Sequence, residues 1–532
     1  MCGQIDRREF MKVFGLAAAV SPWSATTLAQ ERPRAAGSKP NIVIIMADQH
    51  RADVCKREGF PLDTTPFLDH LARQGTWFNR AYTSMPACVP ARVSMLTGRY
   101  PTATRVRSNH NARDATYERD LIDVLRGEGY TTGLCGKNHS YLSRDRLDHW
   151  FELSHDGGFG PDRTEQERAF DEYLRGLHHR AAFEPTPFPL ECQCPYRAVS
   201  SAIKWIDTVD DKPFFLWLSF PEPHNPYQIP EPYFSMFPPQ SLPPTRSSAE
   251  ALAAKGFKFQ FTRELGGKAF ADYDQQVIRA RSNYFGMLRL IDDQIQRLLL
   301  SLKHKGVYDN TIFVSLGDHG DFVGEYGLMR KGPQLPECLA RIPMFFVGPG
   351  VTAGAQPHPA HVSIVDIMPT LCEAIGVPLP VGVQGRSLWP LLTGREYPQA
   401  EFASAYAEQG FGGLHYTAQD TLDPQKEGAL NASVSFDELN SWSQSGTMRM
   451  LRQGDWKLVF DMQGAGQLYN LAKDPAELKN LYDDSDCAAI KQELLAELLA
   501  WTLRVQDPLP LPRRRYVMKT DPRNYWAPYR QP

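Results

Sequence analysis

The segment Asn41-Ile42-Val43-Ile44-Ile45-Met46-Ala47, followed at once by Asp48 and Gln49, decides the fold. After its first residue the run is apolar without alternation, which is typical of a parallel strand covered by helices on both faces. Segments with helical spacing separate it from further strand candidates, the order expected of an α/β fold. These candidates span residues 130–136, 213–220, 311–317 and 342–347. The sequence therefore predicts a large, mostly parallel sheet sandwiched by helices.

Two helices between the strands are indicated by different signals. Thr65 and Pro66 are residue types preferred at the N-cap and first position of a helix, which we expect to reach Gly75. Over residues 271–304, apolar side chains recur at helical spacing, so a long amphipathic helix is predicted there. Loops of a length that often has a binding function are expected at residues 229–244, 249–267 and 410–445.

Residues 1–29 are predicted to be a signal peptide that lies outside the fold. The basic segment 6–12 contains the pair Arg7-Arg8, an apolar stretch follows it, and a small-residue cleavage site ends at Ala29. The arginine pair resembles a twin-arginine leader, which exports proteins already folded. It implies a bacterial protein with a periplasmic or extracellular destination. An ordinary secretory leader and a basic amphipathic helix are the alternatives.

The rest of the chain is predicted to form a large α/β domain, residues 38–394, and a smaller domain, residues 395–507. Apolar side chains recur at helical spacing in the smaller domain, at Ile490, Leu494, Leu498 and Trp501. Such a stripe packs against a sheet, so we expect a small α+β domain in which one helix covers a sheet. Residues 508–532 are expected to be a C-terminal tail.

Net charge and hydropathy exclude several classes of partner. The 532 residues include 58 Lys and Arg and 61 Asp and Glu, a net charge of −3 that provides no bulk attraction to nucleic acid or an anionic membrane. No apolar run approaches the roughly 18 residues that cross a bilayer. We therefore expect no nucleic-acid partner and no stable membrane insertion. The nine cysteines lack the paired spacing of a structural zinc site.

Polar side chains follow four of the predicted strands. In open α/β sheets the ligand lies outside the carboxyl ends of the strands, so residues that follow different strands converge on one place. Any one such residue is more often simply solvated, but four coincidences favour a site. The residues concerned are Asp48 and Gln49, Lys137 and His139, His224, and Asp318 and His319.

The most specific segment is Cys88-Val89-Pro90-Ala91-Arg92, which Thr97-Gly98 follows. A cysteine near the start of a short helix and beside an arginine is a candidate nucleophile, because both features favour an anion. A buried cysteine beside a helix-starting proline is the alternative. The segment resembles the C-x-P-x-R and T-G signature of the type I sulfatases, within the alkaline-phosphatase-like superfamily. In that family this cysteine is converted to formylglycine, whose hydrate is the nucleophile.

The resemblance also implies a site for one divalent metal. Asp48 and the pair Asp318-His319 resemble the family's metal residues, and Gln49 stands where many sulfatases have a second aspartate. With Cys88 as its modified form, these residues make up the implied ligand set. Calcium is expected first because the family usually uses it, and manganese is the alternative because an imidazole suits it better.

The remaining site residues are also implied by the resemblance. Lys137 and Lys331 would bind the sulfate, and a proline-rich segment, residues 333–338, follows Lys331 where the family is usually helical. His224 would protonate the leaving alcohol with help from Lys331, since it lies in a loop similar to P-H-x-P-Y. The other implied roles are those of Arg92, which would brace the formylglycine, His139, which would take a proton from it, and Asn109, which would lie near the sulfate.

The expected activity is that of an exported sulfatase that hydrolyses sulfate monoesters, most naturally of sulfated carbohydrates, to an alcohol and inorganic sulfate. Its partners would be a sulfated small molecule or saccharide and, before export, a formylglycine-generating or maturase enzyme that acts on Cys88. A phosphonate monoester or phosphodiester hydrolase of the same superfamily is the first alternative, favoured by Gln49, Asn109 and His319. A non-catalytic carbohydrate-binding protein is the second.

Overall fold

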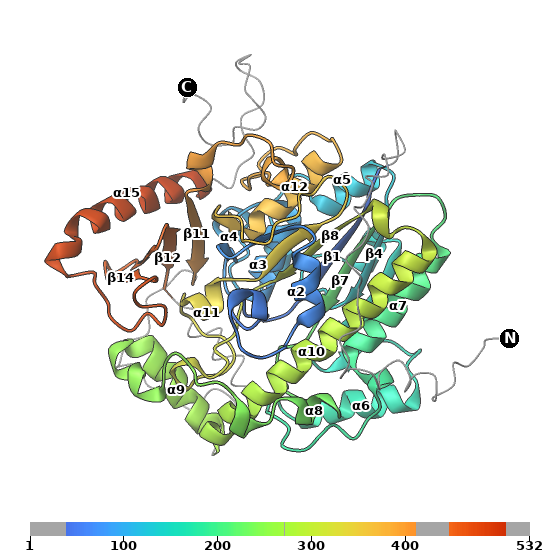
Figure 1. Cartoon of the computed structure of the whole chain (residues 1–532), viewed down its shortest axis with the longest axis horizontal. Coiled ribbons are helices and arrows are strands. Elements are labelled where there is room, and N and C mark those ends of the chain that lie inside the picture. Colours follow the sequence, from blue (N-terminus) through green and yellow to red (C-terminus); the bar gives the residue numbers. More distant parts are fainter. Residues whose placement is uncertain (1–38, 271, 411–445, 507–532) are drawn as a thin grey trace, which may run out of the picture. The chain divides into compact units, whose positions relative to one another are not determined.

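The computed structural model describes residues 39–270, 272–410 and 446–506 (Figure 1). At its centre is an eight-stranded mixed sheet with the strand order β2-β9-β8-β1-β7-β4-β5-β6. In that order the strands span Thr76–Phe78, Met344–Val347, Thr311–Gly317, Asn41–Ala47, Phe214–Phe220, Thr131–Gly136, His149–Ser154 and Gly157–Gly158. The predicted strands are all present, with starts that differ by at most two residues.

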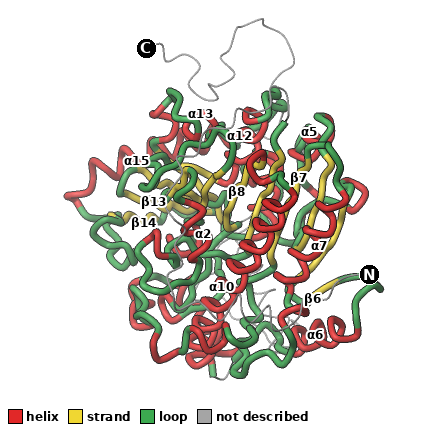
Figure 2. Tube along the Cα trace, turned by 45° about the vertical axis from the view of Figure 1, so that its right-hand side comes forward, coloured by secondary structure: helices red, strands yellow, loops and turns green. Residues whose placement is uncertain are grey.

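Strand β1 is buried on both faces because its alternate side chains enter two different hydrophobic layers. Ile42, Ile44 and Met46 pack with α3, α5 and α12, whereas Val43 and Ile45 pack with α2, α7 and α10. Helices therefore cover both faces of the sheet (Figure 2). The helices span Pro66–Ala72 (α2), Cys88–Thr97 (α3), Leu121–Gly127 (α5), Cys194–Thr208 (α7), Tyr273–Lys305 (α10) and Ile367–Ala374 (α12).

The strands around β1 run in one direction. Strands β8, β1, β7, β4 and β5 pair in parallel, and β9 and β6 join the sheet antiparallel toward its two edges. In register, Ala47 at the end of β1 lies opposite Phe220 of β7 and Gly317 of β8. The carboxyl ends of these strands thus open on the same edge, as predicted. The predicted fold class, a mostly parallel sheet between helices, is confirmed.

Helix α2 begins as predicted at Pro66, but the source of its cap differs from the prediction. The Thr65 hydroxyl makes no capping hydrogen bond. Instead, the buried carboxylate of Asp292, on α10, accepts hydrogen bonds from the backbone N–H groups of Phe67 and Leu68, both at 2.8 Å. An acceptor for the first amides of a helix can come from anywhere in the fold, and here it comes from a residue far away in sequence.

A second, antiparallel sheet lies in the C-terminal part of the chain, with strand order β11-β12-β13-β14 and with α15 packed against it. Leu494, Leu498 and Trp501 of the predicted stripe are buried, together with Val505, whereas Ile490 is half-buried; the predicted small α+β unit is confirmed. Its apolar residues belong to the same core cluster as Ile42 and Ile44 of the large sheet. The elements span Ser404–Gln409, Met448–Gln453, Trp456–Asp461, Gly466–Asn470 and Ala488–Val505.

The prediction of a loop at residues 249–267 is wrong, because this segment is helical. It folds into a short 3-10 helix, Ala249–Ala254, and the helix α9, Phe257–Ala269. Phe259 and Leu265 are buried in this segment, and the ring of Phe259 packs edge-on against Phe322 and Tyr326. The ring of Phe259 therefore anchors this segment to the residues that follow β8.

The remaining short elements are β3 (Ala81–Tyr82), β10 (Val362–Ser363), α4 (Pro101–Thr104), α6 (Glu165–Gly176), α8 (Tyr233–Met236), α11 (Glu337–Ala340) and α13 (Trp389–Leu392). The expected signal peptide, residues 1–29, the tail, residues 508–532, and nearly all of the expected loop at 410–445 lie outside the described residues. Within the residues that are described, no helix is both long and apolar enough to span a membrane.

Candidate active site

Helix α3 begins at Cys88 and carries two of the predicted site residues on one side. Cys88 and Arg92 are four positions apart, so they lie one turn from each other on the same face. Pro90 lies in the first turn, where a missing N–H costs no helical hydrogen bond. The side-chain oxygen of Asn109 accepts a hydrogen bond from the N–H of Val89 at 3.1 Å, which places Asn109 beside the start of this helix.

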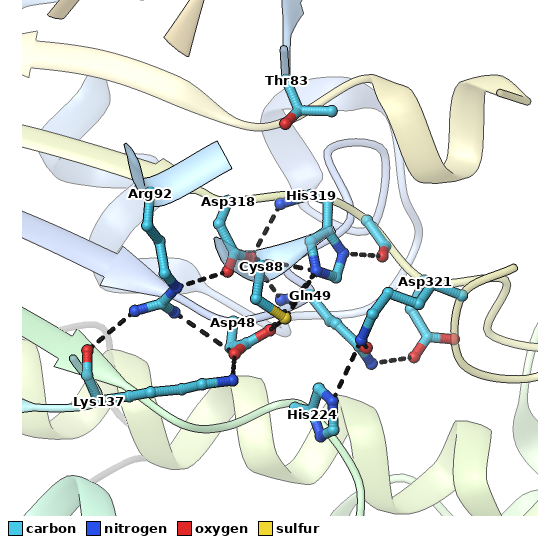
Figure 3. Close-up of polar contacts among 12 residues, drawn as sticks. Asp48, Gln49, Thr83, Cys88, Arg92, Lys137, His224, Asp318, His319 and Asp321 are labelled. Atoms are coloured by element: carbon cyan, nitrogen blue, oxygen red, sulfur yellow. Dashed lines mark hydrogen bonds and ion pairs between the residues drawn. The ribbon is translucent and has the colours of Figure 1, made fainter. Parts of the chain in front are cut away.

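Figure 3 shows that residues following different strands converge on Cys88. Asp48 follows β1, Lys137 follows β4, and Asp318 follows β8. Their side chains are buried beside α3, as the positions after the strands predicted. Residues that are 40 or more positions apart in sequence are therefore in direct contact.

Four of the predicted metal residues form one compact cluster. One ligand atom from each of Asp48, Cys88, Asp318 and His319 lies within 4.8 Å of the others. The Cys88 Sγ is 3.4 Å from Asp48 Oδ1 and 3.2 Å from His319 Nε2. His319 Nδ1 lies 2.9 Å from the Gly320 carbonyl oxygen, to which it donates, so Nε2 keeps its lone pair for a ligand. Two carboxylates and an imidazole nitrogen fit a single divalent metal.

The Arg92 guanidinium neutralises both metal-site carboxylates. It is fully buried, and its Nε lies 2.9 Å from Asp318 Oδ2 while its Nη2 lies 3.4 Å from Asp48 Oδ2. Its Nη1 donates to the Lys137 carbonyl at 2.9 Å and to the Ser219 hydroxyl at 2.8 Å. Arg92 thus joins the carboxylates of Asp48 and Asp318 to the ends of β4 and β7.

Lys137 lies between Asp48, one of the four clustered residues, and a pair of histidines. Its ammonium contacts Asp48 and donates to His155 Nε2 at 2.5 Å. The imidazole of His155 stacks on that of His224, with ring centroids 3.6 Å apart. Sequence reasoning missed His155, although it directly follows β5 and so has the same strand-end position as the residues that were found.

His224 and Lys331 contact each other on the other side of this group of residues. His224 Nδ1 lies 2.6 Å from the Asn225 carbonyl oxygen and donates to it, so Nε2 is the acceptor that faces Lys331 Nζ at 3.3 Å. Burial, together with His155 and Lys331, lowers the pKa of His224 well below its usual value. Lys331 also donates to Gln49 Oε1 at 2.8 Å, so it reaches the site despite the proline-rich segment that follows it.

The environment of position 88 stabilises an anion. Burial and the Asp48 carboxylate raise the pKa of the Cys88 thiol. Lys137, Lys331 and His319 lower it by more, so the pKa falls below that of an ordinary thiol, to about 6. At Asp48, burial raises the pKa, and Lys137, His224 and Arg92 together bring it well below its usual value. Burial, Lys137 and Arg92 lower the pKa of His139, so its imidazole is a neutral proton acceptor. Two carboxylates, Asp48 and Asp318, and the cations of Arg92, Lys137 and Lys331 thus act together on the thiol of Cys88 or on its neighbours.

Comparison with known proteins agrees with this arrangement. A family model described as sulfatase matches residues 40–377. The arylsulfatase of Clostridium perfringens (strain 13 / Type A) is 28% identical over 479 residues, which cover 84% of this chain and 91% of that protein.

Two solved structures share the fold. The phosphonate monoester hydrolase of Agrobacterium radiobacter has a TM-score of 0.71 at 24% identity, with 88% of this chain and 96% of that one covered. BT4656, in complex with its substrate D-glucosamine-2-N,6-O-disulfate, has a TM-score of 0.65 at 20% identity, with 89% and 99% covered. At these identities the two structures support the fold alone.

The resemblance inferred from the Cys88 signature is confirmed, because the family model spans more than half of the chain and includes Cys88 and the residues that surround it. The chain belongs to the sulfatase family, the sulfuric ester hydrolases of alkaline-phosphatase-like fold.

Proposed function

We propose that the protein hydrolyses sulfate monoesters of carbohydrates at Cys88, after that residue has been converted to formylglycine. The observation that carries the proposal is the convergence of Lys137 and Lys331 on a nucleophilic position that already lies against Arg92 and two carboxylates. A sulfate monoester is an anion, so a nucleophile can approach its sulfur only where positive charge offsets the repulsion. Formylglycine supplies a hydrated aldehyde whose hydroxyl is more acidic than that of an ordinary alcohol, so it is more readily available as an alkoxide nucleophile.

Asp48, Asp318 and His319, with Gln49 and the modified residue 88, are the residues that would hold one divalent metal. A bound metal supplies Lewis-acid stabilisation of negative charge at the reacting group. Calcium is the metal we propose, since carboxylate and amide oxygens predominate in the set, and manganese is the alternative because of the His319 nitrogen. Arg92 orients both carboxylates, and its charge favours their ionised forms, although burial and Asp48 still leave the pKa of Asp318 raised.

Cationic residues would bind the sulfate, and histidines would transfer protons. Lys137 and Lys331 bind the sulfate oxygens, and the Asn109 amide nitrogen can donate a further hydrogen bond beside them. The pair Lys331 Nζ and His224 Nε2 holds a proton between them at 3.3 Å and delivers it to the leaving oxygen. His139, a neutral imidazole, then accepts a proton from position 88.

The substrate class and the destination of the protein are proposed together. The disulfated glucosamine substrate of BT4656, a structure with the same fold, supports a sulfated saccharide. The basic and apolar leader at residues 1–29 supports export of a folded protein to the periplasm or beyond. Conversion of Cys88 by a formylglycine-generating or maturase enzyme would then precede export, because folding buries the residue.

Phosphonate monoester hydrolysis is the second candidate function. Gln49, Asn109 and His319 favour it, and the Agrobacterium radiobacter enzyme shares the fold. Lys137 and His139 favour the sulfatase, because they resemble that family's anion site. A non-catalytic carbohydrate-binding protein is disfavoured, since a protein that had lost its activity would be expected to have lost motif residues, and Cys88, Arg92 and Asp318 are all present.

Substitution of Cys88 tests the nucleophile. Cys88→Ala should abolish turnover of 4-nitrophenyl sulfate in protein produced together with a maturase, because no other group in the cluster can form the ester. Cys372→Ala, which removes an equally buried thiol from α12, should retain wild-type turnover. Parallel assays with an aryl phosphonate decide between the two candidates: faster phosphonate turnover would reject the sulfatase, and so would an active Cys88→Ala variant.

Substitution of His224 tests proton delivery to the leaving oxygen. His224→Ala should lower kcat/KM by about 10²-fold or more for esters of poor leaving groups such as sugars, and much less for 4-nitrophenyl sulfate, whose phenolate needs no proton. His358→Ala, at a half-buried histidine that packs on Phe78, is the matched control and should affect neither. Equal losses on both classes of ester would reject the role of His224 in proton transfer.

Metal analysis tests the ligand set. Protein purified without added metal should contain about one equivalent of calcium per chain, and a chelator should remove both the metal and the activity. Asp318→Asn should lose the metal, whereas Asp292→Asn, an isosteric change at a buried carboxylate that caps α2, should keep it. A metal-free protein with full activity would contradict the proposed metal site. If the purified protein contained manganese instead, the site would stand and its metal would be manganese.

A further inference from the structure

The side chain of Gln49 lies between two charged groups of opposite sign, Lys331 and Asp321; Figure 3 shows its contact with Asp321. Its Nε2 donates to Asp321 Oδ2 at 2.9 Å, and its Oε1 accepts from Lys331 Nζ at 2.8 Å. The backbone of Gln49 is held as well, because its N–H donates to Asp318 Oδ1 at 3.0 Å and its carbonyl accepts from the Tyr284 hydroxyl at 2.5 Å. These bonds hold a residue whose φ of 64° is unusual for a side chain other than glycine.

The direction of the amide follows from the partners of Asp321. Both of its oxygens receive hydrogen bonds, from the Val323 N–H at 2.8 Å and from the Tyr227 hydroxyl at 2.7 Å. The Tyr227 oxygen itself accepts from the Arg330 N–H at 3.2 Å, so its own proton points to Asp321. A carboxylate surrounded by donors is an acceptor, and the amide must therefore present its NH₂ group to Asp321. The amide oxygen is then turned toward Lys331.

We propose that Asp321 is a positioning residue that fixes the Gln49 amide with its oxygen toward Lys331 and available to the proposed metal. The proposal rests on the proposed function. Many sulfatases have a second aspartate at position 49, and this chain has the neutral glutamine there. Asp321 is fully buried. Its carboxylate lies behind Gln49 as seen from the proposed site, and the Gln49 amide connects the two through a hydrogen bond.

The orientation of this amide determines where Lys331 can hold its protons. With the oxygen toward Lys331, the ammonium is shared between Gln49 Oε1 and His224 Nε2, the geometry needed for proton delivery. A reversed amide would direct its NH₂ group at an ammonium and remove an oxygen ligand from the metal set. Outer partners that fix a ligand in this way typically change metal affinity or activity by 10–100-fold when they are removed.

Asp321 also connects three parts of the site. It follows β8 together with Asp318, it bonds Gln49 after β1, and through Tyr227 it bonds the loop after β7 that contains His224. A change at Asp321 is therefore expected to affect both metal binding and the leaving-group side. A side chain that only filled space would affect neither selectively.

The test uses isosteric variants of the full-length protein. Asp321→Asn can turn its own NH₂ toward position 49 and release the Gln49 amide, so we expect a loss of about tenfold or more in kcat/KM. The affinity of the chelator-treated protein for Ca²⁺, and in parallel for Mn²⁺, should fall by a similar factor in calorimetric titrations. Asp292→Asn, the same change at another buried carboxylate, should leave both quantities at wild-type values.

A charge exchange between the two positions separates positioning from loss of folding. Gln49→Glu alone places two carboxylates in contact and should be strongly impaired in metal affinity. The double variant Gln49→Glu/Asp321→Asn returns the carboxylate to position 49 and gives it an amide partner. Its losses of metal affinity and of kcat/KM should be smaller than the product of the fold losses measured for the two single variants.

Two results would overturn the proposal: an Asp321→Asn variant with wild-type metal affinity and kcat/KM, or a double variant whose losses equal the product of the single losses. Failure of the proposed function looks different. In that case the wild-type protein would hydrolyse no sulfate ester, yet Asp321→Asn would still weaken metal binding, and the positioning role would be supported.

Discussion

The buried contact between Arg92 and the carboxylates of Asp48 and Asp318 is the interaction on which the site depends. Two carboxylates that end neighbouring parallel strands are fully buried, and a charge without a partner there would cost several kcal/mol. Arg92 satisfies both, and because it is one helical turn from Cys88 it also sets the position of the nucleophile. The positions of the strand ends, of helix α3 and of the proposed metal ligands therefore depend on one another through Arg92.

Much of the fold and the site could be predicted because parallel strands impose a simple geometry. A run that is apolar on both faces, as in Ile42 to Ala47, requires helices above and below it. Parallel neighbours then bring the residues after each strand to one edge, so Asp48, Lys137 and Asp318 could be placed near each other without knowledge of a single contact. Lys331 and Asn109 do not directly follow a strand and were found only by their resemblance to the sulfatase signature.

What the sequence did not reveal depends on contacts between distant residues. His155 follows a strand, yet a lone histidine after β5 is indistinguishable from a solvated one until the fold stacks it on His224. Asp321 belongs to the site only because Gln49 and Tyr227 reach it from other strands. The amides at the start of α2 are likewise capped by Asp292, on a helix more than 200 positions further along the chain.

The proposed mechanism requires that position 88 of the active protein is no longer a cysteine. Mass spectrometry of the tryptic peptide spanning residues 81–92 tests it most directly, because trypsin cleaves after Arg80 and Arg92 and the peptide contains no other cysteine. We expect a peptide in which an aldehyde replaces the thiol and which reacts with a hydrazide but not with a thiol-alkylating reagent. Fully active protein whose peptide contains only unmodified Cys88 would contradict it.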